Sequence, residues 1–407
     1  MILKVKKHYE NFNINNNSLL GLNQFIQKVF FDINMNNLRF LLCRKIKNLL
    51  FYPFCFLVIN MPVNAQSKIE KWQKKRSRFF AVPLISYTPE TNWSFGITAQ
   101  YLTRFKNDTV SNPSITGITS LYTLNKQYIL NPNWDFFFFK NEYRATGALV
   151  YQRYPDSFFG IGNNTLETNR EKYTSDYILL KQRLVKQFTK GFYAGLQYRF
   201  EKTYQLNTIS GGIFEKQQVT GRNGYTASGF GASAIYDTRD NVLFPFKGYY
   251  VTLSNHFYPK WLGTQFPLTN LNLDARYYWN FYKSHVIASN IYSNFNFGEA
   301  PFKMMAQLGG QNLMRGYFQG RYRDQNMVAI QTEYRFPIYW RFIGVIFAGV
   351  GDVFDSFNQL SLNSLKISGG GGLRFTIDAK ERINLRFDYA WGRFQSRGFY
   401  LSISEAF

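Results

Sequence analysis

The stretch RGFYLSISEAF, residues 397–407, ends the sequence with an alternating pattern that predicts a β-strand. On such a strand Phe399, Leu401, Ile403 and Phe407 share one face. A membrane-spanning barrel strand needs apolar groups facing lipid and an aromatic group at the membrane–water interface, whereas a strand of a soluble protein gains little from ending on an aromatic residue. The stretch therefore predicts the closing strand of an outer-membrane β-barrel; a strand at the end of a soluble protein is the alternative.

Composition favours the barrel over two soluble domains, which a chain of 407 residues would also accommodate. Aromatic residues make up 19% of the chain, yet mean hydropathy is only −0.29. After residue 65, no stretch is apolar for the roughly 18 residues that a spanning helix needs. A chain that is rich in aromatics but neutral in hydropathy is typical of strands with one lipid-facing and one wet side.

Strict alternation recurs throughout the chain after residue 78. In the stretch Leu271–Phe281, apolar and aromatic residues occupy every odd position, and mainly polar residues occupy the even ones. A soluble β-sandwich also alternates, but its buried face would be mainly aliphatic and its strands shorter. The pattern predicts sixteen strands at 78–87, 92–105, 114–125, 126–138, 141–154, 173–187, 191–203, 225–237, 247–258, 268–281, 284–297, 325–336, 341–351, 366–377, 382–392 and 398–407.

The connections between these strands alternate in length. An all-β, antiparallel, 16-stranded transmembrane barrel threaded from the periplasm should have long outer loops and short inner turns, with both ends of the barrel in the periplasm. The even strand number fits this arrangement. The long connections are those at 155–172, 204–224, 259–267, 298–324 and 352–365.

The amino-terminal region, residues 1–65, is expected to be a leader. A basic segment at 39–47 precedes the apolar run LLFYPFCFLVI (49–59), and small residues at 63–65 offer a cleavage site. Met35 stands where a signal peptide normally starts, so the true start of translation is expected there. A membrane-anchoring helix is the alternative, although the apolar run is short for one.

The expected division of the chain is leader 1–65, a short periplasmic tail at 66–77 and the barrel at 78–407. Both cysteines, Cys43 and Cys55, fall within the leader. After cleavage the chain would therefore have no disulfide, no thiolate catalyst and no cysteine metal site, and no cofactor is expected.

A formal net charge of +23 invites a nucleic-acid hypothesis. The sequence shows no recognition helix, zinc-ligand spacing or RNA-binding motif, and the export signal points away from nucleic acid. We interpret the charge as a basic lumen together with loops that face outer-membrane lipid and anionic lipopolysaccharide.

The stretch GGQNLMRGYFQGRYRD (309–324) carries the most specific motif. Its Met314-Arg315-Gly316-Tyr317 resembles the hydrophobic-Arg-Gly-aromatic loop motif of the BamA/TamA superfamily of outer-membrane assembly factors, also called the bacterial surface antigen family. The resemblance extends over about residues 80–407. Supporting matches in the same order are Tyr236–Asp240, Glu333–Pro337, Gly370–Phe375 and Leu385–Ala390.

In the family, the loop that carries this motif folds back into the lumen, and an acid on the barrel wall holds its arginine. The resemblance thus implies a loop lock formed by Arg315, Gly316 and Tyr317 within 298–324. A guanidinium removed from bulk water needs such a partner, because its five N–H donors cannot stay unpaired. A solvated basic surface loop that binds lipopolysaccharide is the alternative.

This sequence departs from the family at the usual acid, where Gly349 stands instead. Asp352 lies nearby, but period-two geometry would turn it outward or place it beyond the strand end if Gly349 faces the lumen. By the same parity, Glu333 and Asp388 are the better candidate partners for Arg315.

Family members with POTRA domains insert or translocate proteins through a weak seam between their first and last strands. Here Pro83 and Phe407 would lie at that seam, and Pro83 would weaken it because proline cannot donate to a strand ladder. Only 66–77 precede the barrel after cleavage, which is too short for a POTRA domain. We therefore expect a chain that inserts or translocates proteins, or lipids, with a periplasmic or outer-membrane protein partner supplying substrate recruitment.

The alternative function is a structural or pore-forming barrel, or an accessory subunit, without insertase activity. An outer-membrane hydrolase is a third possibility. Its only support is His256 on the same face as Ser254, which is too little for a catalytic pair, so no enzyme activity is expected.

Overall fold

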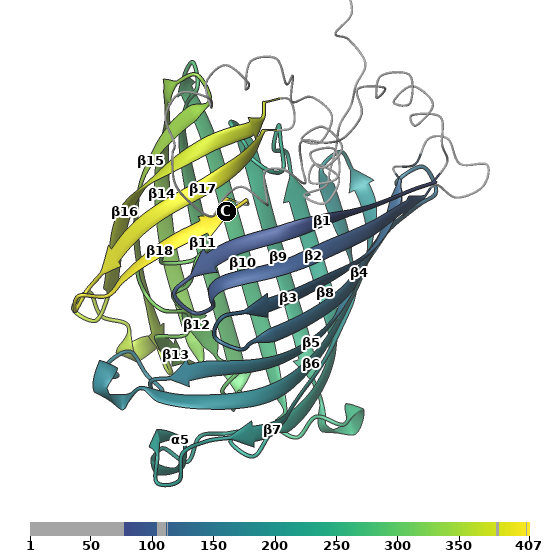
Figure 1. The fold of residues 1–407 in the computed structure, drawn as a ribbon. Helices are drawn as coiled ribbons and strands as arrows, with labels where there is room; N and C mark the ends of the chain where they lie inside the picture. Colours follow the sequence, from purple (N-terminus) through teal and green to yellow (C-terminus); the bar gives the residue numbers. More distant parts are fainter. Residues whose placement is uncertain (1–76, 104–110, 112, 380–381, 404) are drawn as a thin grey trace, which may run out of the picture.

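The computed structural model describes residues 77–103, 111, 113–379, 382–403 and 405–407. The expected leader lies outside the described residues, and so does the expected periplasmic tail except for Ser77. The described chain forms one curved antiparallel sheet that closes on itself (Figure 1). Within this part of the chain, no helix is both long and apolar enough to cross a membrane.

Sixteen strands form the barrel wall, and each pairs with its neighbours in an antiparallel sense. The sequence prediction of a 16-stranded antiparallel barrel is confirmed. The strands are β1 (Ser77–Thr88), β2 (Asn92–Thr103), β3 (Ser114–Thr123), β4 (Tyr128–Phe138), β5 (Tyr143–Phe158), β6 (Glu171–Thr189), β7 (Phe192–Asn207), β8 (Tyr225–Asp237), β9 (Gly248–Tyr258), β10 (Leu268–Tyr282), β11 (His285–Gly298), β14 (Asn326–Tyr339), β15 (Phe342–Phe354), β16 (Lys366–Asp378), β17 (Ile383–Gly392) and β18 (Arg397–Ser402).

The alternation that predicts these strands is visible as two different faces of the wall. On β2, Phe95 and Ile97 are 47% and 50% exposed on the outside, whereas Thr98 and Gln100 are buried on the inside. Apolar side chains are favoured on the outer face, which contacts lipid hydrocarbon. Polar side chains are favoured on the inner face, where they can pair with one another. This opposition of faces sets the register, because a slip of one residue would exchange the two.

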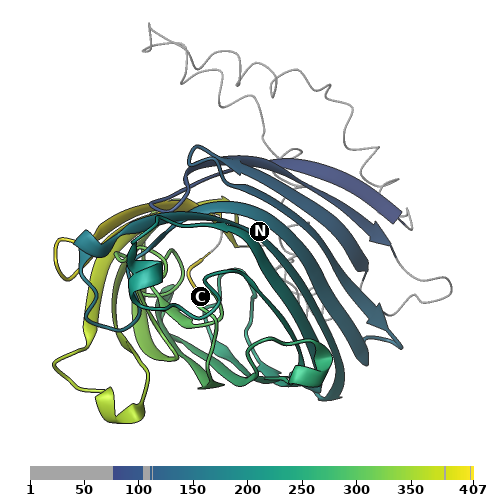
Figure 2. The ribbon, with the colours of Figure 1, turned by 90° about the horizontal axis from the view of Figure 1, so that it is seen from below.

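The predicted strands agree with the observed ones to within four residues at either end, except for the last strand. That strand was expected to run to Phe407, but β18 ends at Ser402. The residues beyond Ser402 turn into the barrel, where Phe407 is only 6% exposed (Figure 2). The expectation that Phe407 lies on the closing strand is therefore wrong.

Most long connections gather at one end of the barrel, the lower end in Figure 1, and mostly short turns at the other, although the β8–β9 connection at 238–247 is longer than the β9–β10 connection at 259–267. The long-loop end carries short helical turns, and the connection from β11 to β14 contains a separate two-stranded hairpin. These elements are η1 (Glu167–Asn169), α5 (Ile213–Lys216), η2 (Lys260–Leu262), β12 (Ala306–Leu308), β13 (Tyr322–Asp324) and η3 (Phe357–Gln359).

The outer loops pack on one another as well as on the wall. Phe158 stacks on Phe214 of α5 with ring centroids 4.2 Å apart, and both rings contact Phe302 of the β11–β14 connection. Arg323 on β13 accepts a main-chain hydrogen bond from Gly162 at 2.8 Å. The long-loop end is thus covered by loops that hold each other in place.

Candidate functional site

The connection between β11 and β14 packs against the inner side of the wall. Leu308, Met314, Tyr317 and Tyr322 of this connection are almost fully buried. They form one cluster with side chains of the inner faces of β14 and β15, namely Met327, Ala329 and Val353. Because the partners alternate with outward-facing residues on their strands, this cluster lies on the luminal side.

Arg315 is the polar centre of this packing and is 1% exposed. Its Nη1 donates to Asp388 Oδ2 on β17 at 2.5 Å, and its Nη2 donates to Glu333 Oε1 on β14. Phe347 of β15 lies flat beneath it, with the guanidinium carbon 3.6 Å from the ring centroid. Although burial opposes a charge, Glu333 and Asp388 raise the pKa of Arg315, so the guanidinium stays charged.

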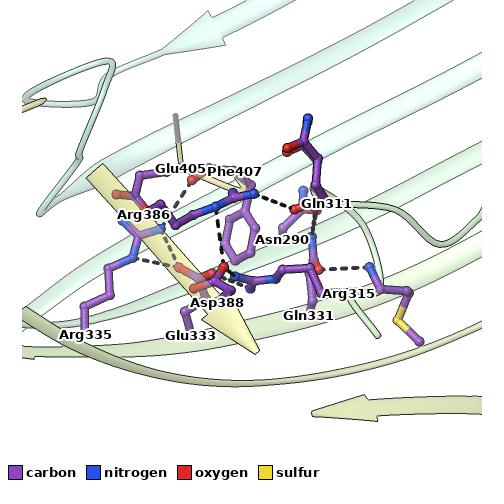
Figure 3. A network of polar contacts seen from close by, with 12 residues as sticks. Asn290, Gln311, Arg315, Gln331, Glu333, Arg335, Arg386, Asp388, Glu405 and Phe407 are labelled. Atoms are coloured by element: carbon purple, nitrogen blue, oxygen red, sulfur yellow. Dashed lines mark hydrogen bonds and ion pairs between the residues drawn. The ribbon is translucent and has the colours of Figure 1, made fainter. Parts of the chain in front are cut away.

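Three further arginines enter the same cluster from β14, β16 and β17, and Figure 3 shows part of it. Arg335 Nε donates to Glu333 Oε2 at 2.9 Å, and Arg374 Nη1 donates to Asp388 Oδ1 at 2.5 Å. Arg386 Nη2 donates to the carbonyl oxygen of Gln311 in the loop at 3.0 Å. Buried charges of this kind are tolerated only when they are paired and hydrogen-bonded, so the loop and the wall depend on each other here.

Gly316 connects the motif to β18. Its N–H donates to Tyr400 Oη at 3.0 Å, and its carbonyl accepts from Ser396 Oγ at 2.6 Å. Its φ is +103°, and a Cβ would lie 2.6 Å from the carbonyl carbon of Trp391. Only glycine fits this backbone shape at this distance.

Tyr317 reaches two further elements. Its hydroxyl donates to the carbonyl of Ile367 on β16 at 2.7 Å and accepts from the N–H of Arg393 at 2.9 Å. The ring lies over Gly392, where a Cβ would approach the ring to 2.5 Å. The three motif residues therefore contact β14, β16, β17 and β18 and fasten the last strands of the barrel together.

Asp352 is not brought to Arg315. It is buried at the long-loop end, where its Oδ2 accepts from Asn163 Nδ2 at 3.0 Å and from Ser364 Oγ. Period-two geometry places it on the other side of β15 from Gly349. Gly349 itself faces the motif, and a Cβ there would lie 2.9 Å from Met314 Sδ, so the acid found in the family at this position would displace the Met314 side chain.

The junction between the first and last strands is short. Among the described residues, β1 and β18 are matched at Tyr87 and Leu401 alone, whereas β1 pairs with β2 along its full length. Figure 1 shows the purple β1 and the yellow β18 converging near the end of β1 and diverging above it. Pro83 lies in the part of β1 that β18 does not reach.

Phe407 lies across the lumen from this junction. Its ring packs with Tyr278 of β10 and Ala288 of β11, and Arg335 lies over it, 5.8 Å from the ring centroid. Arg335 Nη2 also donates to the main-chain oxygen of Phe407 at 3.3 Å. Nearby, Glu405 accepts from Arg374 Nε at 2.7 Å and from Asn384 Nδ2 at 3.3 Å. These contacts replace the strand pairing that the sequence predicts.

One contact attaches the long loop to the first hairpin. Glu90, in the turn between β1 and β2, accepts from the N–H of Gln319 at 2.7 Å. Burial raises the pKa of Glu90, although the hydrogen bond from Gln319 works in the opposite direction. Compared with the network on β14 to β18, this is a slight attachment.

A polar cavity of about 470 Å³ lies between the long loop and the wall. Asn270, Asn290, Asn294 and Asn296 line it from β10 and β11, and Phe407 borders it. Several of these amides bond one another, as Asn270 Nδ2 does with Asn296 Oδ1 at 2.8 Å. The part of the lumen left open by the loop is therefore lined by amides together with charged side chains, namely Arg199, Asp274, Arg276 and Lys303.

The described residues offer little for catalysis. His256 lies near Gln197, 3.5 Å from its Nε2, and its ring is stacked on Tyr258. Among these residues no group of three His, Cys, Asp or Glu side chains is placed to hold a metal ion. The cluster around Arg315 joins four arginine side chains with three acidic ones by ion pairs and can hold strands together.

Sequence reasoning did not single out Arg335, Arg374, Arg386, Glu405 or Tyr400. The alternation of their strands could have indicated that the three arginines and Tyr400 face the lumen, since each stands between two apolar or aromatic neighbours. Glu405 lies beyond Ser402, where the predicted strand does not continue, so alternation could not have indicated its contact.

The fold is similar to those of known barrels. BamA from Haemophilus ducreyi lacking POTRA domains 1–3 matches with a TM-score of 0.55 at 13% identity, over 80% of this chain and 70% of that one. CdiB from Escherichia coli matches with a TM-score of 0.52 at 9% identity, over 94% of this chain and 75% of that one. CdiB from Acinetobacter baumannii matches with a TM-score of 0.50 at 11% identity, over 81% of this chain and 60% of that one. At these identities the likeness concerns the fold.

No curated protein sequence matches the chain. The model of the Omp85 superfamily domain matches residues 87–407, which is nearly the whole barrel. Members of this superfamily are typically transporters or insertases of the Gram-negative outer membrane rather than enzymes. The resemblance drawn from the loop motif and the prediction of an integral outer-membrane protein are confirmed: the chain belongs to the Omp85 superfamily.

Proposed function

We propose that this chain takes part in the insertion or translocation of proteins, or lipids, at the outer membrane, by opening the junction between β1 and β18. The observation that carries the proposal is the single matched pair, Tyr87 and Leu401, across that junction. Backbone N–H and C=O groups cannot stay unpaired against hydrocarbon without a large cost. The β1 edge before Tyr87 is therefore suited to accept an incoming strand by main-chain hydrogen bonds.

The two sides of the junction differ in how firmly they are held. On the β18 side, Tyr400 and Ser396 bond Gly316, and Glu333 and Asp388 bond Arg315. On the β1 side, the contact of the long loop is Glu90 with Gln319. We therefore infer that the first hairpins move when the junction opens, while the last strands stay in place.

Pro83 adds to this asymmetry. If the register of Tyr87 with Leu401 continued, Pro83 would face Glu405. Proline has no N–H to donate, so a ladder at this point would be weakened. Glu405 instead pairs with Arg374 inside the barrel, which supports an edge of β1 kept free for another strand.

Substrate recruitment is assigned to a protein partner, because the described part of the chain consists of the barrel and its loops. The ion pairs that hold Arg315 against the wall support a structural role for this cluster, and members of the superfamily are typically not enzymes.

A disulfide across the junction tests the proposal. The chain has no cysteine after Cys55, so Tyr87→Cys with Leu401→Cys would introduce one defined pair. Opposed residues of antiparallel strands have Cα atoms about 4.5–5.5 Å apart, within the range for a disulfide. The matched control is Tyr101→Cys with Thr116→Cys, across the regular β2–β3 pairing.

In the native bacterium, oxidation of the junction pair should lower outer-membrane protein assembly and slow growth, and a reductant should restore both. The control pair should leave both unchanged when oxidised. If assembly and growth stay normal with the junction fully cross-linked, the proposal fails, and a structural or pore-forming barrel or accessory subunit is the better account.

A further inference from the structure

The short-turn end of the barrel carries a repeated pairing of an aromatic residue with a cation. In four connections a Lys or Arg directly follows an aromatic residue, and in the β6–β7 turn one residue separates them. We call these positions the inner collar. Its members are Phe139 with Lys140, Phe188 with Lys190, Phe246 with Lys247, Tyr282 with Lys283, and Trp340 with Arg341.

Most of the rings of the inner collar are strongly exposed. Phe139 and Trp340 are 74% and 72% exposed, and Phe188 and Tyr282 are 61% and 55% exposed. Burial in a core does not explain them. The five cations of the inner collar are exposed as well.

Several rings of the inner collar have a cation close to the ring face. Lys283 Nζ lies 5.0 Å from the centroid of the Tyr282 ring, and the guanidinium carbon of Arg341 lies 5.2 Å from that of Trp340. Attraction between a cation and the face of an aromatic ring favours such positions. An apolar ring and a positive charge are therefore presented together.

The charges of the inner collar are not neutralised by nearby acids. At this end Glu142 pairs with Lys186 at 3.0 Å, Asp240 with Arg382 at 2.6 Å and Asp237 with Arg239 at 2.7 Å. Each of these acids thus already has a basic partner outside the inner collar. Asp378, at the end of β16, is a fourth acid at this end and has an interaction of its own. Within the described chain, none of the five collar cations forms an ion pair, so these cations remain available to an outside anion.

The positions of these pairs around the barrel indicate the kind of partner. The turns of the inner collar are the five consecutive connections at this end from β4–β5 to β14–β15, and they form an arc over ten of the sixteen wall strands. An arc of this length exceeds a compact protein-docking patch and follows the line along which a bilayer meets the wall. Rings at the acyl–headgroup boundary with cations beside them match a membrane interface rich in negative headgroups.

We propose that the inner collar binds the phosphate groups of anionic phospholipids in the leaflet at the short-turn end. The rings lie at the boundary between acyl chains and headgroups, and the flexible lysine side chains extend to the phosphates. Selectivity comes from the collar cations that form no ion pair, because a zwitterionic headgroup carries its own cation and offers no net attraction.

The test uses the purified full chain, reconstituted in vesicles of equal parts phosphatidylglycerol and phosphatidylcholine and then analysed by native mass spectrometry for retained lipid. The collar variant is Lys140→Gln, Lys190→Gln and Lys283→Gln. The matched control is Lys172→Gln, Lys216→Gln and Lys260→Gln, three exposed lysines at the long-loop end. Heat-dependent electrophoretic mobility verifies that all three proteins are folded.

The wild-type chain and the control variant should retain several-fold more phosphatidylglycerol than phosphatidylcholine, and the collar variant should retain the two at near parity. High salt should reduce the preference of the wild-type chain, since exposed charges are screened. Equal retention by the wild-type chain, or an unchanged preference in the collar variant, overturns the proposal. A third outcome also overturns it: the wild-type chain retains the two lipids equally, and an acidic protein binds the wild-type chain but not the collar variant. The inner collar would then be a protein-binding surface.

Discussion

Glu405 accepts a hydrogen bond from Arg374 Nε at 2.7 Å, and this contact draws the end of the chain into the barrel instead of along β1. Both side chains are buried, and Arg374 also bonds Asp388. The position of the last residues is therefore linked to the same charged cluster that holds the long loop.

Replacing Glu405 by glutamine should release the residues after Ser402. The substitution removes a charge from a buried ion pair and weakens the acceptor for Arg374. We expect amide hydrogen exchange at Ala406 and Phe407 to become about tenfold faster, equivalent to about 1.4 kcal/mol. The control is Glu142→Gln, which removes a half-exposed acid paired with Lys186. Equal exchange in both variants would show that Glu405 does not hold this segment.

Arg315→Ala should destabilise the whole barrel. It would leave Glu333 and Asp388 buried with one cation fewer between them, and removing one partner of a buried pair typically costs about 3–5 kcal/mol. Thermal unfolding in detergent, followed by electrophoretic mobility, should shift to lower temperature, and protease should reach residues 299–324 sooner. Arg315→Lys should recover only part of the loss, because an ammonium cannot bond both acids with the same fork geometry. An unchanged protease pattern would exclude Arg315 as the lock of the loop.

Local pattern predicted the wall of this barrel, and distant contacts decided the rest. Alternation specifies strands such as β10, because each residue meets either lipid or the lumen. The same alternation indicated Glu333 and Asp388 as the acids that face Arg315, and the structure places both beside it. No local pattern could indicate that Glu405 and Phe407 would turn inward, since their partners are Arg374 and the wall of β10 and β11.

Gly316→Ala should undock the loop motif even though it adds only one methyl group. The new Cβ would lie 2.6 Å from the main-chain carbon of Trp391, and a φ of +103° is unfavourable for alanine. The hydrogen bonds to Tyr400 and Ser396 should weaken together, so exchange at the N–H of Gly316 should rise steeply. Gly211→Ala is the control, because its φ is +70° and nothing lies within 4 Å of its Cβ. Comparable effects of the two substitutions would mean that backbone strain alone, and not the close contact, sets the result.

The closed long loop should be more stable in mild acid than at neutral pH because of Asp324. This residue of β13 is 6% exposed, and burial raises its pKa from 3.8 to about 6. A hydrogen bond from Gln325 lowers this pKa, whereas the nearby acids Asp355 and Asp352 raise it further. The closed loop therefore binds a proton that the opened loop releases, so lowering the pH from about 6 towards about 4 favours closure, and raising it above about 6 removes that gain.

Hydrogen exchange in residues 306–324, corrected for the intrinsic effect of pH, measures this directly. Exchange should be several-fold slower at about pH 5 than at about pH 7.5 in the wild-type chain. Asp324→Asn is neutral throughout and should keep the slow rate at both values, whereas Asp240→Asn, at the other end of the barrel, should retain the wild-type dependence. A pH dependence that persists in Asp324→Asn would assign it to Asp352 or Asp355, and exchange that slows as the pH rises would contradict the direction of the effect.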